Sequence, residues 1–182
     1  LDQNLVENMG TRYEYLVKQN TKLLLGPKYV ILGKEYYLER NNISRRNNPI
    51  KRVLISFGGV DEFNFTGKLV DHFSGNKFKD IQFEVAVTDS FVFLDDLLTR
   101  SSQTNFKIHR NIDSLAVLMR ECDIAIGAGG TTTWERLSLA LPSAVITIAD
   151  NQLETAKLLS KKGLIHWIGH YDTLDKGWKE SL

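Results

Sequence analysis

The sequence predicts an α/β protein in which a parallel sheet is covered by helices on both faces. From Lys51 onward, short apolar runs alternate with segments of helical spacing, and the connections between them are short. This alternation is typical of βαβ units, which form parallel sheets. The 182 residues, 42% of them apolar and 25% charged, suffice for one well-buried globular domain.

Each element is expected where the hydrophobic period and the turn residues agree. Apolar runs bounded by turns predict strands at 53–57, 81–87, 106–108, 123–126, 143–148 and 164–168. Helical spacing predicts helices at 64–73, 91–100, 112–121, 131–141 and 151–161. Asn111 or Asp113 is the expected cap of the third helix, Pro142 ends the fourth, and Gly163 ends the last.

The first 50 residues follow a different pattern. Residues 1–22 are polar with weak helical spacing, and 23–25 are expected to form a short strand. Residues 28–38 are expected to form a short helix, with an extended arm as the alternative. Residues 40–50 are a polar linker with Pro49 near its end. We therefore expect two units, 1–48 and 49–182. The basic pairs Arg45-Arg46 and Lys51-Arg52 are interpreted as solvated flanks of the linker rather than a binding patch.

Composition argues against several classes of function. A net charge of +1 does not favour nucleic-acid binding, and no apolar run approaches the length of a membrane span. With no signal-peptide pattern and a single cysteine, Cys122, we expect a cytoplasmic protein. His166 and His170 are a poor metal pair in an expected strand, so neither a metal nor another cofactor is expected.

The best candidate for a ligand site is a glycine-rich turn that opens onto a helix. Gly129 and Gly130 follow an apolar strand, and Thr131 and Thr132 come next. Backbone N–H groups and hydroxyls at a helix start can bind a diphosphate. The alternative is an ordinary tight turn between a strand and a helix. The segment is neither a Walker A motif nor a G-x-G-x-x-G fingerprint.

Two further features flank this turn. Glu135 lies one turn into the helix, where its carboxylate can accept hydrogen bonds from two ribose hydroxyls or simply complement the helix dipole. Gly58 and Gly59 end the first strand and can approach the same phosphates, whereas Asp61 is better explained as a helix cap.

A third polar turn follows the next strand. Asn151 and Gln152 carry neutral donors and acceptors suited to sugar hydroxyl or acetamido groups, and their alternative role, shared with Asp150, is to cap the following helix. All three turns lie at the expected carboxyl ends of parallel strands, where such sheets bind ligands. They can therefore line one crevice.

With these residues in place, the chain resembles the C-terminal domain of family 28 glycosyltransferases. The segment from Gly127 to Ala156 carries this resemblance. It is most similar to the UDP-sugar hydrolases of pseudaminic acid biosynthesis, which share stretches like Leu24–Tyr29, Ser56–Gly59 and Ala149–Gln152. Spore coat polysaccharide biosynthesis proteins share the pattern as well. The resemblance implies a Rossmann-like sheet that forms one half of a two-domain GT-B architecture.

The resemblance also implies roles for the candidate residues. Gly129, Gly130, Thr131 and Thr132 would face the diphosphate of UDP or a UDP-sugar, with Gly58 and Gly59 beside it. Glu135 would bind the ribose, and Asn151 and Gln152 the sugar. The family's catalytic histidine lies in a G-x-G-H-x-x-R turn of the N-terminal domain, and no such turn occurs here. Since the chain also begins at Leu1 rather than Met, we expect part of a longer enzyme that lacks the catalytic residue and that partners its own N-terminal domain.

Three functions remain open at this point. The first is the nucleotide-binding half of a UDP-sugar hydrolase. The second is a glycosyltransferase that uses a UDP-sugar donor, because both use the same nucleotide-binding half. The third is a non-catalytic nucleotide-sugar-binding module.

Overall fold

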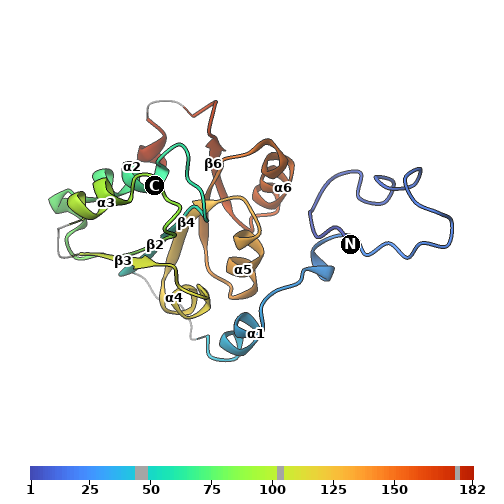
Figure 1. Ribbon diagram of the computed structural model, residues 1–182, viewed down its shortest axis with the longest axis horizontal. Coiled ribbons are helices and arrows are strands. Elements are labelled where there is room, and N and C mark those ends of the chain that lie inside the picture. Colours follow the sequence, from blue (N-terminus) through green and yellow to red (C-terminus); the bar gives the residue numbers. More distant parts are fainter. Residues whose placement is uncertain (44–48, 102–104, 175–176) are drawn as a thin grey trace.

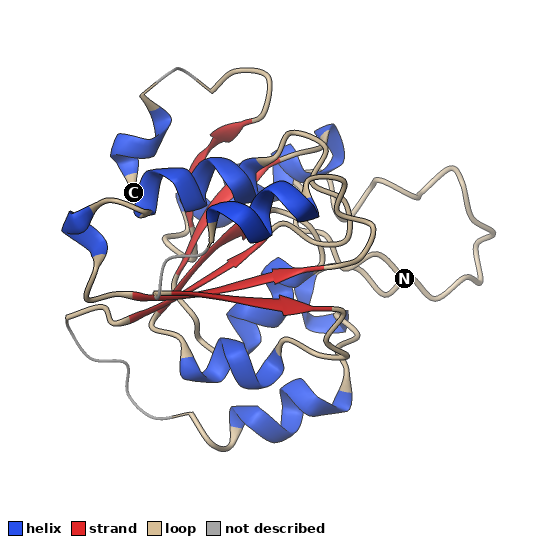
Figure 2. Cartoon of the chain, turned by 60° about the vertical axis from the view of Figure 1, so that its left-hand side comes forward, coloured by secondary structure: helices blue, strands red, loops and turns tan. Residues whose placement is uncertain are grey.

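A six-stranded parallel sheet forms the centre of the protein, with strand order β3-β2-β1-β4-β5-β6. The computed structural model describes residues 1–43, 49–101, 105–174 and 177–182. Figures 1 and 2 show the sheet between two layers of helices. The strands are β1 (Arg52–Ser56), β2 (Gln82–Val87), β3 (Phe106–Arg110), β4 (Ile124–Ala128), β5 (Ser143–Thr147) and β6 (His166–His170).

The α-helices of the described residues alternate with these strands after the first helix. They are α1 (Lys34–Arg40), α2 (Phe65–Phe73), α3 (Leu94–Arg100), α4 (Ala116–Glu121), α5 (Thr132–Ser138) and α6 (Asp150–Lys161). Short 3-10 turns lie at Pro27–Tyr29, Asn76–Phe78 and Trp178–Ser181. The predicted α/β class is confirmed.

The direction of chain travel divides the helices between the two faces. The chain moves from β1 to β3 through α2 and α3, which bury Leu69 and Leu97 against one face in a cluster with Ile55 and Phe83. It then returns to β4 and continues to β6 through α4, α5 and α6, which cover the other face. The order reverses at β1, which pairs with both β2 and β4. In sheets of this kind ligands bind at such a reversal.

Each predicted strand and helix after Lys51 is found, with shifted ends. Helix α4, predicted at 112–121, begins at Ala116, and neither predicted cap, Asn111 or Asp113, is used. Asn111 instead adopts a left-handed φ of 47° and accepts a hydrogen bond from the N–H of Asp89. The Oγ of Ser114 accepts from the Ala116 N–H. Asp61 does cap its helix, accepting from the N–H groups of residues 65 and 66.

Two predictions for the N-terminal part are wrong. Residues 23–25 form only an isolated bridge, between Asp2 and Leu25, and the helix expected at 28–38 is α1, which starts after Gly33. Before α1 the chain forms the 3-10 turn Pro27–Tyr29 and then an irregular segment, 30–33, in which Val30 and Leu32 pack against the core. The expected unit boundary at 48 and the Arg45-Arg46 pair lie outside the described residues.

Helix α1 packs on the same face of the sheet as α4. Its Tyr36 is buried in a cluster with Leu54 and Met119, and its Glu39 pairs with Arg120 of α4. Cys122 lies in the same cluster, where burial raises the pKa of its thiol to about 12. Cys122 is thus a core residue.

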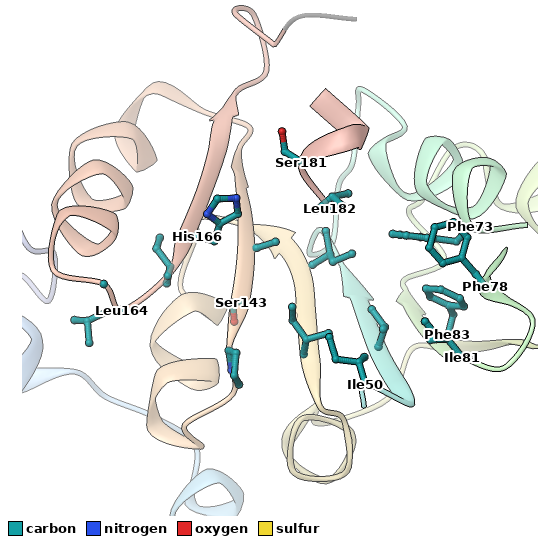
Figure 3. A pocket seen from close by; sticks show the side chains of 17 residues that line it. Ile50, Phe73, Phe78, Ile81, Phe83, Ser143, Leu164, His166, Ser181 and Leu182 are labelled. Atoms are coloured by element: carbon teal, nitrogen blue, oxygen red, sulfur yellow. The ribbon is translucent and has the colours of Figure 1, made fainter. Parts of the chain in front are cut away.

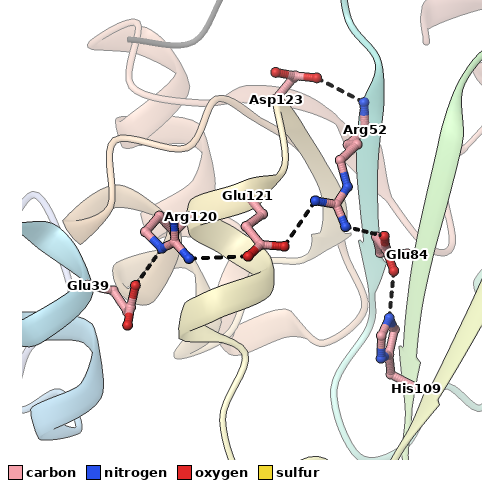
Figure 4. A network of polar contacts seen from close by, with 7 residues as sticks. All are labelled: Glu39, Arg52, Glu84, His109, Arg120, Glu121 and Asp123. Atoms are coloured by element: carbon pink, nitrogen blue, oxygen red, sulfur yellow. Dashed lines mark hydrogen bonds and ion pairs between the residues drawn. The ribbon is translucent and has the colours of Figure 1, made fainter. Parts of the chain in front are cut away.

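A buried carboxylate links three strands on the same face (Figure 4). Glu84 of β2 is 1% exposed, and its two oxygens lie 2.6 Å from Nη2 of Arg52 and 2.6 Å from Nε2 of His109. The other branch of the Arg52 guanidinium pairs with Glu121 at 2.9 Å. Burial by itself would raise the pKa of Glu84, but the hydrogen bonds from His109 and Arg52 lower it below the ordinary value.

Glu84→Gln is therefore expected to destabilise the fold by about 3 kcal/mol at pH 7, because it leaves Arg52 without its buried partner. A lowered carboxyl pKa stabilises the folded state above the unfolded pKa, and this contribution is lost as the pH falls through the folded pKa. Urea unfolding at pH 7 and pH 4 measures both effects. The control is Glu121→Gln at the half-exposed partner, expected to cost about 0.5 kcal/mol. Equal costs for the two variants would contradict the assigned role of Glu84.

Candidate functional site

The register of the sheet brings the three predicted turns to one edge. Ser56 of β1 pairs with Gly127 of β4, so Gly58-Gly59 and Gly129-Gly130 leave the sheet side by side. Ala128 of β4 pairs with Ile146 of β5, which places the turn at Asp150 next to them. All three turns therefore lie at the carboxyl ends of adjacent strands, around the point where the strand order reverses.

The glycines at this edge allow close approach of backbone and side chains. A Cβ at Gly127 would lie 2.1 Å from the carbonyl oxygen of Ser56, and one at Gly129 3.0 Å from Cγ2 of Thr147. The first distance is closer than a Cβ can come, and the second is so tight that the Thr147 side chain would have to move. Gly58 has a φ of 84°, which disfavours any residue with a Cβ.

A polar cleft of about 200 Å³ lies between the β4 and β5 turns. Five predicted residues line it together: Gly129, Gly130, Thr131, Asn151 and Gln152. The other four do not: Gly58, Gly59, Thr132 and Glu135. The structure thus supports a common cleft for the second and third turns, while the first turn follows the adjacent strand and Glu135 faces α1.

Gln152 presents donors to this cleft. Its Oε1 accepts a hydrogen bond of 3.0 Å from the N–H of Ile148. Because the amide oxygen is used in this way, the NH₂ group is left to donate to a ligand. The prediction that Asp150 or Asn151 caps the following helix is wrong, since α6 has no side-chain cap. Asp150 instead lies 3.1 Å from Nε2 of His170, whose Nδ1 is 2.9 Å from the Thr147 hydroxyl.

Glu135 is half-buried between α5 and α1. The Tyr36 hydroxyl donates a hydrogen bond to its carboxylate. Burial raises the pKa of Glu135, although the Tyr36 hydrogen bond and the charge of Arg136 oppose this shift. The same burial, with the charge and hydrogen bond of Glu135, raises the pKa of Tyr36. The ionised carboxylate is thus held where it lowers stability, as is common at functional sites.

Arg136 is a buried cation beneath the glycine turn. It is 1% exposed, and its Nη2 donates to the carbonyl oxygen of Ala128 at 2.7 Å and to the Thr133 hydroxyl at 3.1 Å. Its Nη1 donates to the Thr132 hydroxyl at 3.4 Å. Burial lowers the pKa of Arg136 to about 10, so the guanidinium remains charged at neutral pH. Among the described residues no carboxylate forms an ion pair with it.

Sequence reasoning missed the residues that complete the cleft wall: Gln3, Asn4, Trp134 and Thr155. The N-terminal segment reaches the cleft because the Thr155 hydroxyl donates to the Leu5 carbonyl at 3.0 Å. Its remaining residues form an open loop at one side of the molecule (Figure 1). This contact joins positions 150 residues apart, so no local pattern could have revealed it. Trp134 lines the cleft and is also buried in the cluster with Val145 of β5.

A second cavity of about 470 Å³ is apolar and lies near the opposite edge (Figure 3). Residues at the amino ends of the strands line it, among them Ile50, Ile81 and His166, together with Leu182. It opens on the face that α5 and α6 leave uncovered. Because the cavity lies at the amino ends of the strands and the polar turns lie at their carboxyl ends, it is separate from the predicted ligand site.

The described residues contain neither a cluster of potential metal ligands nor a membrane-spanning helix. Within those ranges no three His, Cys, Asp or Glu residues are grouped closely enough to hold a metal ion. None of the helices there has the length and apolar character required to cross a bilayer.

Comparisons with known proteins agree with the fold. No family model matches the chain. It is 35% identical over 148 residues to MJ1062, an uncharacterised protein of Methanocaldococcus jannaschii, covering 78% of this chain and 30% of that protein. It is 24% identical over 157 residues to SpsG of Bacillus subtilis, covering 84% of this chain and 45% of SpsG, a spore coat polysaccharide biosynthesis protein. The chain thus spans less than half the length of either relative.

Among solved structures, the chain resembles WaaG, a glycosyltransferase involved in lipopolysaccharide biosynthesis, with a TM-score of 0.53 and 11% identity. The match covers 82% of this chain and 40% of WaaG. The expected similarity to spore coat polysaccharide biosynthesis proteins is confirmed by SpsG. The chain has the Rossmann-like fold of GT-B glycosyltransferases.

Proposed function

We propose that this chain is the nucleotide-sugar-binding half of a UDP-sugar hydrolase in the biosynthesis of a surface polysaccharide or a sialic-acid-like sugar. The observation that carries the proposal is the polar cleft at the carboxyl ends of β4 and β5, lined by the glycine turn, Asn151 and Gln152. The glycosyltransferase-like fold and the relative SpsG support the same class of ligand.

The diphosphate, the ribose and the sugar of a nucleotide sugar each have a matching group at this edge. The N–H groups of Gly129 and Gly130 and the hydroxyls of Thr131 and Thr132 are donors for a diphosphate. Glu135 would accept from ribose hydroxyls with the carboxylate oxygen that Tyr36 leaves free. The sugar would lie against Asn151 and the donating amide of Gln152, opposite Gln3 and Asn4, which line the same cleft. Gly58 and Gly59 would lie next to the phosphates.

In the whole enzyme, a histidine of the N-terminal domain would activate water to displace UDP from the sugar. The donors of this chain would stabilise the charge that develops on the departing diphosphate. Residues 1–48 would then be the end of that domain and the segment between the domains, and 49–182 the nucleotide-binding domain. A cytoplasmic location suits such a step.

A glycosyltransferase that uses a UDP-sugar donor is the second candidate. It is favoured by the fold shared with WaaG, since donor binding requires the same cleft. A non-catalytic binding module would use the cleft in the same way. The N-terminal part of the whole protein distinguishes them, because a G-x-G-H-x-x-R turn there favours hydrolysis.

The chain should bind UDP in preference to ADP. Because half of a two-domain cleft makes only part of the contacts, we expect a free energy of roughly −5 kcal/mol or weaker. Ligand-detected NMR or calorimetry at millimolar nucleotide measures this. Equal binding of UDP and ADP would count against the assignment of the base.

The purified 182-residue chain should not hydrolyse UDP-sugars. Loss of a general base costs about a hundredfold or more in rate, and no histidine turn of the required type is present. Release of UDP, followed by chromatography over several hours, tests this. Release above the rate of the uncatalysed reaction would mean that the chain carries its own catalytic residue.

Glu135→Gln should weaken UDP binding by about 2 kcal/mol, because a neutral amide oxygen replaces a charge-assisted acceptor for the ribose hydroxyls. Binding of the 2′-deoxy analogue dUDP should change less, since it lacks one hydroxyl. Titration of both ligands into the parent and the variant measures the difference.

Thermal stability provides the control for this variant. The raised pKa of Glu135 means that its ionised form costs stability at neutral pH, a cost that disappears as the pH falls below the unfolded pKa. Glu135→Gln removes that cost and keeps an acceptor for Tyr36, so the melting temperature should be unchanged or higher. Glu35→Gln, at a neighbouring carboxylate on α1, should leave UDP affinity unchanged. Unaltered UDP affinity in Glu135→Gln would remove Glu135 from the site.

A further inference from the structure

Arg136 contacts one group that the proposed function assigns to the diphosphate, the Thr132 hydroxyl, and the carbonyl of the peptide that carries another, the Gly129 N–H, although it lies outside the cleft itself. The guanidinium reaches the Thr132 hydroxyl with Nη1 and the carbonyl oxygen of Ala128 with Nη2. Its Nη1 would also lie 3.0 Å from a Cβ at Gly127, so the guanidinium packs directly against the end of strand β4. Each contact has a consequence for the direction of a hydrogen-bond donor.

The first consequence concerns Thr132. A guanidinium has donors only, so the hydroxyl oxygen of Thr132 must accept from Arg136. Within the described residues the hydroxyl hydrogen of Thr132 has no acceptor in the protein, and the side chain is half-exposed. The hydroxyl is therefore available as a donor to a ligand oxygen.

The second consequence concerns the peptide between Ala128 and Gly129. In a planar trans peptide, the C=O and the N–H point in opposite directions. Because Arg136 and Thr133 both hold the Ala128 carbonyl oxygen, the N–H of Gly129 is directed away from them. Gly129 lines the polar cleft, so this N–H is the second donor whose orientation Arg136 controls.

The free-energy cost of burying Arg136 argues against a purely structural role for it. A buried guanidinium without a carboxylate partner costs more than an apolar side chain of similar size would. Its Nε is buried with no hydrogen-bond partner among the described residues. An anion above the turn would compensate this charge.

We propose that Arg136 is a positioning residue, whose buried guanidinium directs the Thr132 hydroxyl and the Gly129 N–H toward an anionic diphosphate. The inference rests on the proposed function and adds to it the residue that sets selectivity for the charged ligand. It predicts that Arg136 affects recognition of the diphosphate and not of the nucleoside.

The test compares UDP with uridine, which lacks the diphosphate, in the parent, Arg136→Lys, Thr132→Val and the double variant. A lysine carries its donors on a single nitrogen, so it cannot reach the Ala128 carbonyl and the Thr132 hydroxyl with the geometry of a guanidinium. Arg136→Lys should lower the ratio of UDP affinity to uridine affinity by about tenfold, and Thr132→Val by a few-fold. In the Thr132→Val background, Arg136→Lys should lower the ratio by less than it does alone. One of the two donors that Arg136 orients, the Thr132 hydroxyl, is already absent there.

The outcomes separate this inference from the proposed function. A parent chain that binds uridine as tightly as UDP overturns both. A parent that prefers UDP, with the same preference in Arg136→Lys or an equal loss of UDP and uridine affinity, overturns the inference alone. Should Arg136→Lys fail to fold by circular dichroism, Thr132→Val and Thr132→Ser decide. A lower ratio in Thr132→Val with the parental ratio in Thr132→Ser supports the inference, and a parental ratio in Thr132→Val overturns it.

Discussion

The close contact between β1 and β4 is the constraint on which the rest of the site depends. The carbonyl oxygen of Ser56 lies where a Cβ of Gly127 would be, so only glycine permits this register. The register fixes where the two strands end and therefore where their turns begin. Behind the contact, Arg136 holds the final carbonyl group of β4. A shift of one residue would move the whole carboxyl edge relative to α5.

Two charged groups on α5 are buried near this edge in a way that the remainder of the core avoids. Glu135 has the Tyr36 hydroxyl as its hydrogen-bond partner and feels the charge of the next residue, Arg136, with which no carboxylate of the described residues forms an ion pair. By contrast, Glu84 is as deeply buried but bonds to both Arg52 and His109. Complete pairing is typical of a structural network, whereas adjacent groups that each lower stability are typical of a functional site. The contrast supports the proposed ligand site at the α5 edge, whereas the pairing among β1, β2 and β3 is structural.

The two cavities differ in character because of how the chain crosses the sheet. The polar cleft forms where strands end in turns, and turns supply backbone donors and amide side chains. The apolar cavity forms where three successive strands are covered by helices on one face only, leaving their amino ends next to the C-terminal turn. The larger volume of the apolar cavity therefore reflects the topology of the chain, and the proposed site for an anionic ligand is the smaller, polar cleft.

The sequence by itself determined the α/β class, the order of strands and helices, and the three turns, because these follow from local hydrophobic period and turn residues. The residues of the glycine turn, Asn151 and Gln152 were predicted in this way, and five of them share one cleft. Local pattern misplaced the caps of α4 and α6, since Asn111 and Asp150 bond to partners about 20 residues away. Only the tertiary structure decided that Gln3 and Asn4 line the cleft and that Arg136 is buried beneath it. These facts depend on packing between segments far apart in the chain, which no local pattern records.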